Sequence, residues 1–154
     1  MREKPIKVKI DKHLEIPVIT HDGGMEAEGF AKIEVNNVDC AVRAIAIAAG
    51  MEYPEAHKML KKAGRRDDNV FRTAEFMKHK RRINGYKVTK VESTLIELEC
   101  YFVSDFVKQY NKGRYLVRYP GHVFAVIDGV LIDSAPTFRH FIGEYVSHAW
   151  KFQY

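Results

Sequence analysis

The feature that most constrains the fold is the run CAVRAIAIAA at residues 40–49, in which Arg43 is the only charged side chain. A helix that is apolar on every side must be enclosed by other elements, because none of its sides suits water. We therefore expect residues 40–49 to form the central helix, with Gly50 ending it. A chain of 154 residues is long enough to bury such a helix in one domain. We divide this domain into an N-terminal strand and loop extension (1–35) and a core (36–154).

Two more helices are expected after the central one. Residues 53–64 carry Pro54 in the first turn and Gly64 after the end, and residues 69–85 form a helix with a basic tail. Residues 94–102 are ambiguous, and residues 103–113 read as a short helix. Alternation of apolar and polar residues, or short apolar runs, predicts strands at 6–10, 15–19, 86–91, 114–119, 122–127, 130–134 and 145–152.

Helices followed mainly by antiparallel strands predict an α+β architecture. Pro17 cannot donate a backbone hydrogen bond, so we expect the strand at 15–19 to lie at a sheet edge.

The segment GHVFAVIDGVLIDS predicts a tight hairpin with Asp128-Gly129 as its two-residue turn. Counting back from this turn puts Phe124 opposite Asp133, and opposed residues project from the same face. His122 shares that face, because side chains alternate along a strand. His122 and Asp133 are therefore diagonal neighbours about 7 Å apart at Cα, within side-chain reach.

Cys40 stands where the central helix begins. Asp39 or Asn37 could cap this helix, which leaves Cys40 in its first turn. There the unpaired backbone N–H groups and the positive end of the helix dipole favour a thiolate. The same N–H groups could bind an oxyanion during acyl transfer. The alternative is that Cys40 only fills the core, as buried cysteines often do.

A nucleophilic thiol needs a base and a group that orients the base. We assign Cys40 as nucleophile, His122 as base and Asp133 as the orienting carboxylate. The other six histidines lie in charged or loop-like sequence, or lack a carboxylate at a strand spacing. A Cys-His-Asp triad can perform hydrolysis, transamidation or deamidation, and the spacing of the three residues in the sequence does not distinguish these reactions.

These motifs resemble the papain-like cysteine peptidase superfamily. NNVDCAVRAIAIA is similar to the D-G-N-C-L-x-R-A-I/L segment of ovarian-tumour-type deubiquitinases, with Cys40, Arg43, Ala44 and Ile45 matching its second half. GHVFAVIDGVLIDS is similar to the G-H-x-x-x-V…D pattern of bacteriocin-processing peptidases. Over roughly residues 36–152 the chain also resembles small bacteriophage proteins with an N-D-C-x-x-R-A start and a G-R-Y-x-V-R-x-x-G-H-x-x-A-V-x-D-G core. The resemblance implies a papain-like fold and a peptidase or isopeptidase acting on protein or peptide.

The chain departs from these families before the cysteine. Glu34 stands where many superfamily members have a glutamine that helps to form the oxyanion hole, and Asn37 stands where the ovarian-tumour motif has aspartate. We assign Asn37 and Asn36, with the backbone N–H of Cys40, as replacement oxyanion donors.

Charge is spread unevenly along the chain. Residues 57–90 hold 12 Lys+Arg against 3 Asp+Glu, whereas the rest holds 13 against 17. This segment is either a solvated helical surface or a binding surface for nucleic acid or an acidic host protein. In the second case the protein would be an inactive papain-like phage module acting as a binder or inhibitor. The candidate binding residues are Lys61, Lys62, Arg65, Arg66, Lys80, Arg81 and Arg82.

Other classes of protein fit the sequence less well. Two cysteines outside a C-x-x-C pair predict neither a disulfide framework nor a zinc site, and no metal or organic cofactor is implied. No segment approaches the roughly 18 apolar residues of a membrane helix, and MREKPIKVKI lacks the apolar core of a signal peptide. We therefore expect no membrane partner and a cytoplasmic location, in the host cytoplasm if the protein is phage-encoded.

Overall fold

The fold is described from a computed structural model, in which residues 6–9, 15–20, 40–66, 71–133 and 143–154 are defined. The helices of these residues are α1 (Cys40–Ala49), α2 (Tyr53–Lys62), α3 (Thr73–Lys78), α4 (Thr94–Glu97) and α5 (Val103–Gln109). The strands are β1 (Ile6–Lys9), β2 (Glu15–Thr20), β3 (Arg82–Ile83), β4 (Tyr86–Lys90), β5 (Arg114–Tyr119), β6 (His122–Ile127), β7 (Val130–Asp133) and β8 (His148–Gln153).

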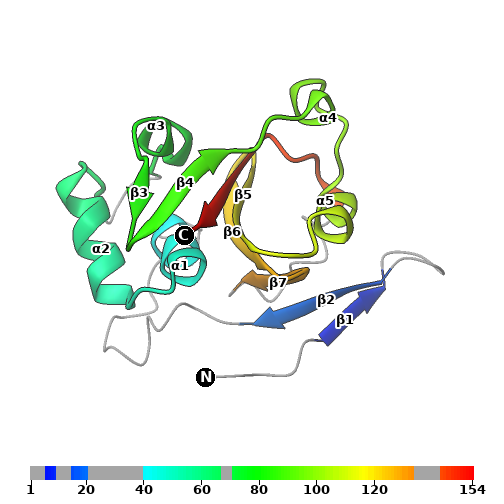
Figure 1. Cartoon of the computed structure of the whole chain (residues 1–154), viewed down its shortest axis with the longest axis horizontal. Coiled ribbons are helices and arrows are strands. Elements are labelled where there is room, and N and C mark those ends of the chain that lie inside the picture. The colour runs from blue at the N-terminus through cyan, green and yellow to red at the C-terminus, as the bar shows by residue number, and fades with distance from the viewer. Residues whose placement is uncertain (1–5, 10–14, 21–39, 67–70, 134–142) are drawn as a thin grey trace.

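Within the described residues, the eight strands form one strongly curved sheet in the order β1-β2-β7-β6-β5-β8-β4-β3 (Figure 1). The α+β class is therefore confirmed. The sheet is not wholly antiparallel, because β2 runs parallel to β7 and pairs Val18 with Leu131. This pairing also makes the N-terminal strands part of the same sheet as the core.

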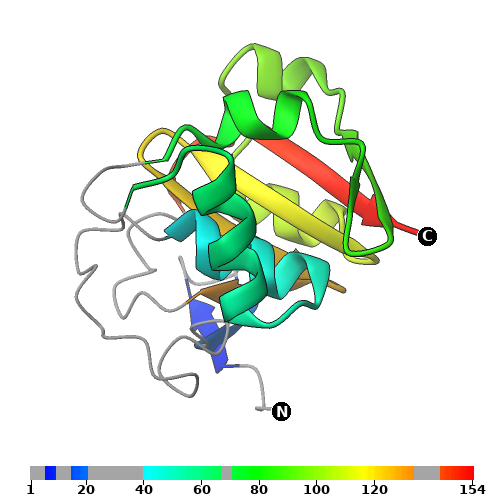
Figure 2. The ribbon, with the colours of Figure 1, turned by 90° about the vertical axis from the view of Figure 1, so that its left-hand side faces the viewer.

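Helices cover both faces of the sheet. Helices α1, α2 and α3 lie on one face, and α4 and α5 lie on the other (Figure 1). Turning the molecule shows α1 and α2 crossing in front of the strands (Figure 2). Each face has its own buried cluster: Leu116 and Ala125 join the α1 side, whereas Val117 and Phe124 join the α5 side. This alternation follows from the two-residue period of a strand.

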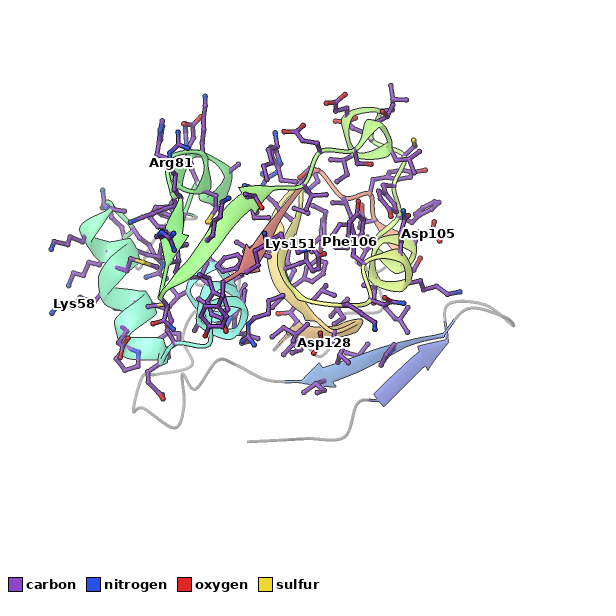
Figure 3. The ribbon with its side chains drawn as sticks, in the orientation of Figure 1. Lys58, Arg81, Asp105, Phe106, Asp128 and Lys151 are labelled. Carbon is purple, nitrogen blue, oxygen red and sulfur yellow. The ribbon has the colours of Figure 1, made fainter. Side chains whose placement is uncertain are left out.

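The central helix is confirmed with its predicted bounds. Nine of the ten residues of α1 are buried, including the charged Arg43. At its C-terminal end Arg114 of β5 donates two hydrogen bonds, from Nε to Ala48 O at 2.8 Å and from Nη2 to Ile47 O at 3.0 Å. On the opposite face, Phe106 of α5 points into the cluster between α5 and the curved strands (Figure 3).

Three expectations about single elements need correction. The helix expected at 69–85 covers only Thr73–Lys78, and its predicted basic tail instead leads into β3. The ambiguous residues 94–102 form the one-turn helix α4 and a turn. Strand β2 lies second from the edge, between β1 and β7. Pro17 is tolerated there because the ladder to β7 begins at Val18, one residue later.

Candidate active site

The predicted hairpin and its register are confirmed. Ile127 pairs with Val130, and Ala125 pairs with Ile132, as a two-residue turn requires. His122, the first residue of β6, and Asp133, the last residue of β7, therefore project from the same face. Nε2 of His122 lies 2.5 Å from Oδ2 of Asp133.

The pair is removed from water. The side chains of His122 and Asp133 are 2% and 4% exposed. Burial lowers the pKa of His122, but hydrogen bonds with Asp133 and Cys40 and the negative charges of both partners outweigh it. Their net effect raises the pKa of His122 from 6.5 to about 9. Cys40 itself is buried, with 8% of its surface exposed.

The thiol and the imidazole meet at the ends of their elements. Val123 belongs to the buried cluster around α1, whereas His122 shares the opposite side of β6 with Phe124, at a ring-centroid distance of 6.2 Å. Cys40 is the first residue of α1, and His122 is the first residue of β6. The contact therefore forms where the first residue of α1 meets the first residue of β6.

Sequence reasoning missed a tyrosine beside this cluster. Tyr119 pairs with His122 across β5 and β6, and their ring centroids are 5.7 Å apart. Burial raises the pKa of Tyr119, and the negative charges of Asp133, Glu144 and Cys40 raise it further. The motif Tyr119-Pro-Gly-His122 already carries the signal for this pair, because Pro-Gly is a favoured two-residue turn.

The predicted oxyanion donors Asn36 and Asn37 lie outside the described residues. Among the described residues, Cys40 begins α1, so its backbone N–H belongs to the first turn, where helical N–H groups lack an intrahelical acceptor. Its place in the helix is therefore compatible with the role assigned to it from the sequence.

The predicted basic surface is largely exposed, with one correction. Lys61, Lys62 and Arg66 are exposed at the end of α2. Arg81 and Arg82 are exposed beyond α3, and Lys80 is half-buried. Arg65 is only 4% exposed and does not belong to this surface. The chain turns back after α2, where the N–H of Arg65 donates to Leu60 O at 2.9 Å, so the side chain is covered.

Two further features, a metal site and a membrane-spanning helix, are absent from the part of the chain that the structure defines. No group of three or more His, Cys, Asp or Glu side chains is arranged there to hold a metal ion. None of the helices defined there has the length and apolar character that crossing a membrane requires. Searches against protein-family models, curated proteins and solved structures found no match to this chain.

Proposed function

We propose that the protein is a papain-like cysteine hydrolase, a peptidase or isopeptidase that uses Cys40, His122 and Asp133. The observation that carries the proposal is the 2.5 Å contact between His122 and Asp133 on an imidazole that also contacts the Cys40 thiol. A carboxylate, an imidazole and a thiol in this sequence of contacts are what acyl transfer by sulfur requires.

Each residue has a defined role in this reaction. Asp133 accepts the Nε2–H of His122, which fixes the tautomer and leaves Nδ1 to exchange a proton with the thiol. The imidazolium form that Asp133 favours stabilises the Cys40 thiolate. The sulfur then attacks the substrate carbonyl carbon, and a carbon–sulfur bond forms.

Collapse of the tetrahedral intermediate breaks the carbon–nitrogen bond, and the imidazolium gives its proton to the departing amine. His122 next takes a proton from water, whose oxygen attacks the thioester carbon. The carbon–sulfur bond breaks, the thiolate and imidazolium are restored, and the acid product leaves. Free N–H groups in the first turn of α1 suit the oxyanion formed in both steps.

Alkylation by iodoacetamide near neutral pH tests the proposal, because the chain contains its own reference thiol. Cys100 is exposed, whereas Cys40 is buried. On access alone Cys100 would react faster. We expect Cys40 to react at least about tenfold faster, because His122 contacts the Cys40 thiol and a neighbouring imidazolium makes a thiol more reactive.

His122→Ala is the matched variant. It should slow alkylation of Cys40 and leave Cys100 unchanged, as measured by mass spectrometry of the two cysteine peptides. Slow alkylation of Cys40 that does not depend on His122 would count against the proposal. Cys40 would then be a packing residue.

A second role, binding of nucleic acid or of a host protein, is supported by the exposure of the cations at the end of α2 and beyond α3. Binding through such a surface weakens steeply as salt is raised. Electrophoretic mobility shift with single-stranded DNA at low salt tests this role. Unchanged DNA mobility at low salt would remove nucleic acid as the partner.

A further inference from the structure

A groove opens between α3 and the ends of β4 and β8. Its volume is about 620 Å³. The apolar part of its lining includes Met77, Val88 and Trp150, of which Trp150 is only 3% exposed. The ring of His148 lies stacked on that of Trp150, with centroids 5.6 Å apart and planes 10° apart. The lining is completed by charged side chains.

The charge of this groove is predominantly positive. Four cations line it, Lys78, Lys80, Arg81 and Lys90. Two carboxylates, Glu75 and Glu92, stand among them. Figure 3 labels Arg81 beside α3, at the α3 end of this groove.

The strand register connects the groove to the candidate active site. His148 pairs with Arg118 of β5, and Arg118 pairs with Val123 of β6, the residue next to His122. Two strand spacings separate His148 from β6, which is about 10 Å. Val123 and Cys40 belong to the same buried cluster. The groove therefore lies on the α1 side of the sheet, and its His148 end is two strands away from β6, whose first residue, His122, contacts Cys40.

Arg118 continues the positive charge from the groove toward β6, the strand that begins with His122. Its Nη1 donates to Ser147 Oγ at 2.9 Å, which holds the guanidinium next to His148. Burial lowers the pKa of His148, and the positive charges of Arg118 and Lys90 lower it further. The electrostatic field around His148 therefore disfavours an added cation and favours a bound anion.

We propose that this groove binds an acidic segment of a polypeptide and presents the neighbouring peptide bond to Cys40. The identification of that polypeptide as substrate rests on the function proposed above, whereas binding of the acidic segment does not. Carboxylates of the segment pair with the groove cations, and its backbone N–H groups can donate to Glu75 and Glu92.

A polypeptide fits the groove better than a nucleic acid. Single-stranded nucleic acids are held by aromatic rings on which bases stack. The tryptophan of this groove is buried beneath His148 and offers no open ring face. Glu75 and Glu92 would also repel a continuous chain of phosphates, whereas an acidic peptide can keep its carboxylates apart from them.

Fluorescence anisotropy with the Cys40→Ala variant tests binding without cleavage. The probes are a fluorescein-labelled glutamate-rich dodecapeptide, a lysine-rich peptide of equal length and a single-stranded oligothymidylate. We expect the acidic peptide to bind and the lysine peptide not to bind. The double variant Lys78→Glu/Lys90→Glu should weaken binding of the acidic peptide at least tenfold.

Lys108→Glu/Lys112→Glu is the matched control, because it reverses two exposed cations at the end of α5 and just after it, both outside the groove. It should bind the acidic peptide like the parent. Equal weakening in both double variants, or tighter binding of the oligothymidylate than of the acidic peptide, would overturn the proposal. Far-UV circular dichroism verifies that each variant folds.

The two proposals can fail separately. If the acidic peptide binds but Cys40 alkylates slowly whatever residue stands at 122, the groove is a docking site on an inactive protein. If Cys40 is reactive but the acidic peptide does not bind, the hydrolase proposal stands and the substrate assignment is wrong.

Discussion

Nε2 of His122 and Oδ2 of Asp133 lie 2.5 Å apart between two side chains that are almost fully buried. An ion pair in such a place is favoured only because the two groups satisfy each other, since either charge alone would be costly to bury. The contact therefore determines the protonation state of the ring that faces Cys40.

Asp133→Asn keeps the shape of the side chain and removes its charge. The pKa of His122 should fall from about 9, because burial, which disfavours the imidazolium, then acts without the carboxylate that opposes it. Histidine ring signals followed by NMR against pH measure this directly. An unchanged titration midpoint in Asp133→Asn would show that Asp133 does not hold the imidazolium.

The same shift predicts how stability depends on pH. The pKa of His122 is raised in the folded protein above 6.5, so protonation of the ring stabilises the fold fully below pH 6.5. This contribution, on the order of 3 kcal/mol, is lost as pH rises toward 9. Urea unfolding of the parent should therefore show a free energy of unfolding that declines between these pH values. The decline should be smaller in Asp133→Asn.

The ring of Tyr119 packs against the ring of His122, with ring centroids 5.7 Å apart. Tyr119→Ala would remove this ring contact and let the His122 imidazole turn away from the Cys40 sulfur. Alkylation of Cys40 should therefore slow by about tenfold or more. Tyr119→Phe keeps the ring contact and should stay closer to the parent. Tyr154→Ala, at a tyrosine that is 91% exposed, is the control and should have no effect. Equal rates in Tyr119→Ala and the parent would contradict a positioning role.

Arg114 fixes the C-terminal end of α1 to the sheet through the carbonyls of Ile47 and Ala48. Arg114→Met keeps much of the aliphatic stem but leaves both carbonyls without their charged donor, which should cost about 2–3 kcal/mol of unfolding free energy. Lys151→Met is the control on the neighbouring strand, where Nζ lies 6.0 Å over the Tyr115 ring. It should cost less than about 1 kcal/mol. Similar losses in urea unfolding of the two variants would contradict this account.

Local patterns in the sequence were enough to predict part of the site. A two-residue turn leaves one register for the strands beside it, so Asp128-Gly129 determines that His122 and Asp133 share a face. The all-apolar run at 40–49 likewise has one physical outcome, a buried helix. Both predictions depend on residues close together in the chain.

Some features that sequence reasoning missed are local, such as Tyr119 and the buried Arg65, but others depend on residues far apart in the chain. The parallel pairing of β2 with β7 joins Val18 to Leu131, and nothing near either residue encodes it. Arg65 reads as part of a basic surface, yet the turn after α2 buries it. The groove beside α3 arises only when β8, at the end of the chain, inserts between β5 and β4.

Gly129→Ala tests whether the hairpin turn holds the site together. Gly129 has φ +77°, and an added Cβ would lie 3.2 Å from Asn111 Cβ and 3.3 Å from its Cα. Strain and clash together should cost about 2–4 kcal/mol in urea unfolding. Gly64→Ala is the matched control, because Gly64 has φ +104° and nothing within 4 Å of an added Cβ. It should lose only the strain, about 1–2 kcal/mol.

Because the turn sets the register of His122 and Asp133, alkylation of Cys40 should slow in Gly129→Ala and not in Gly64→Ala. Equal losses of stability and unchanged alkylation in both variants would show that the turn can shift without disturbing the pair.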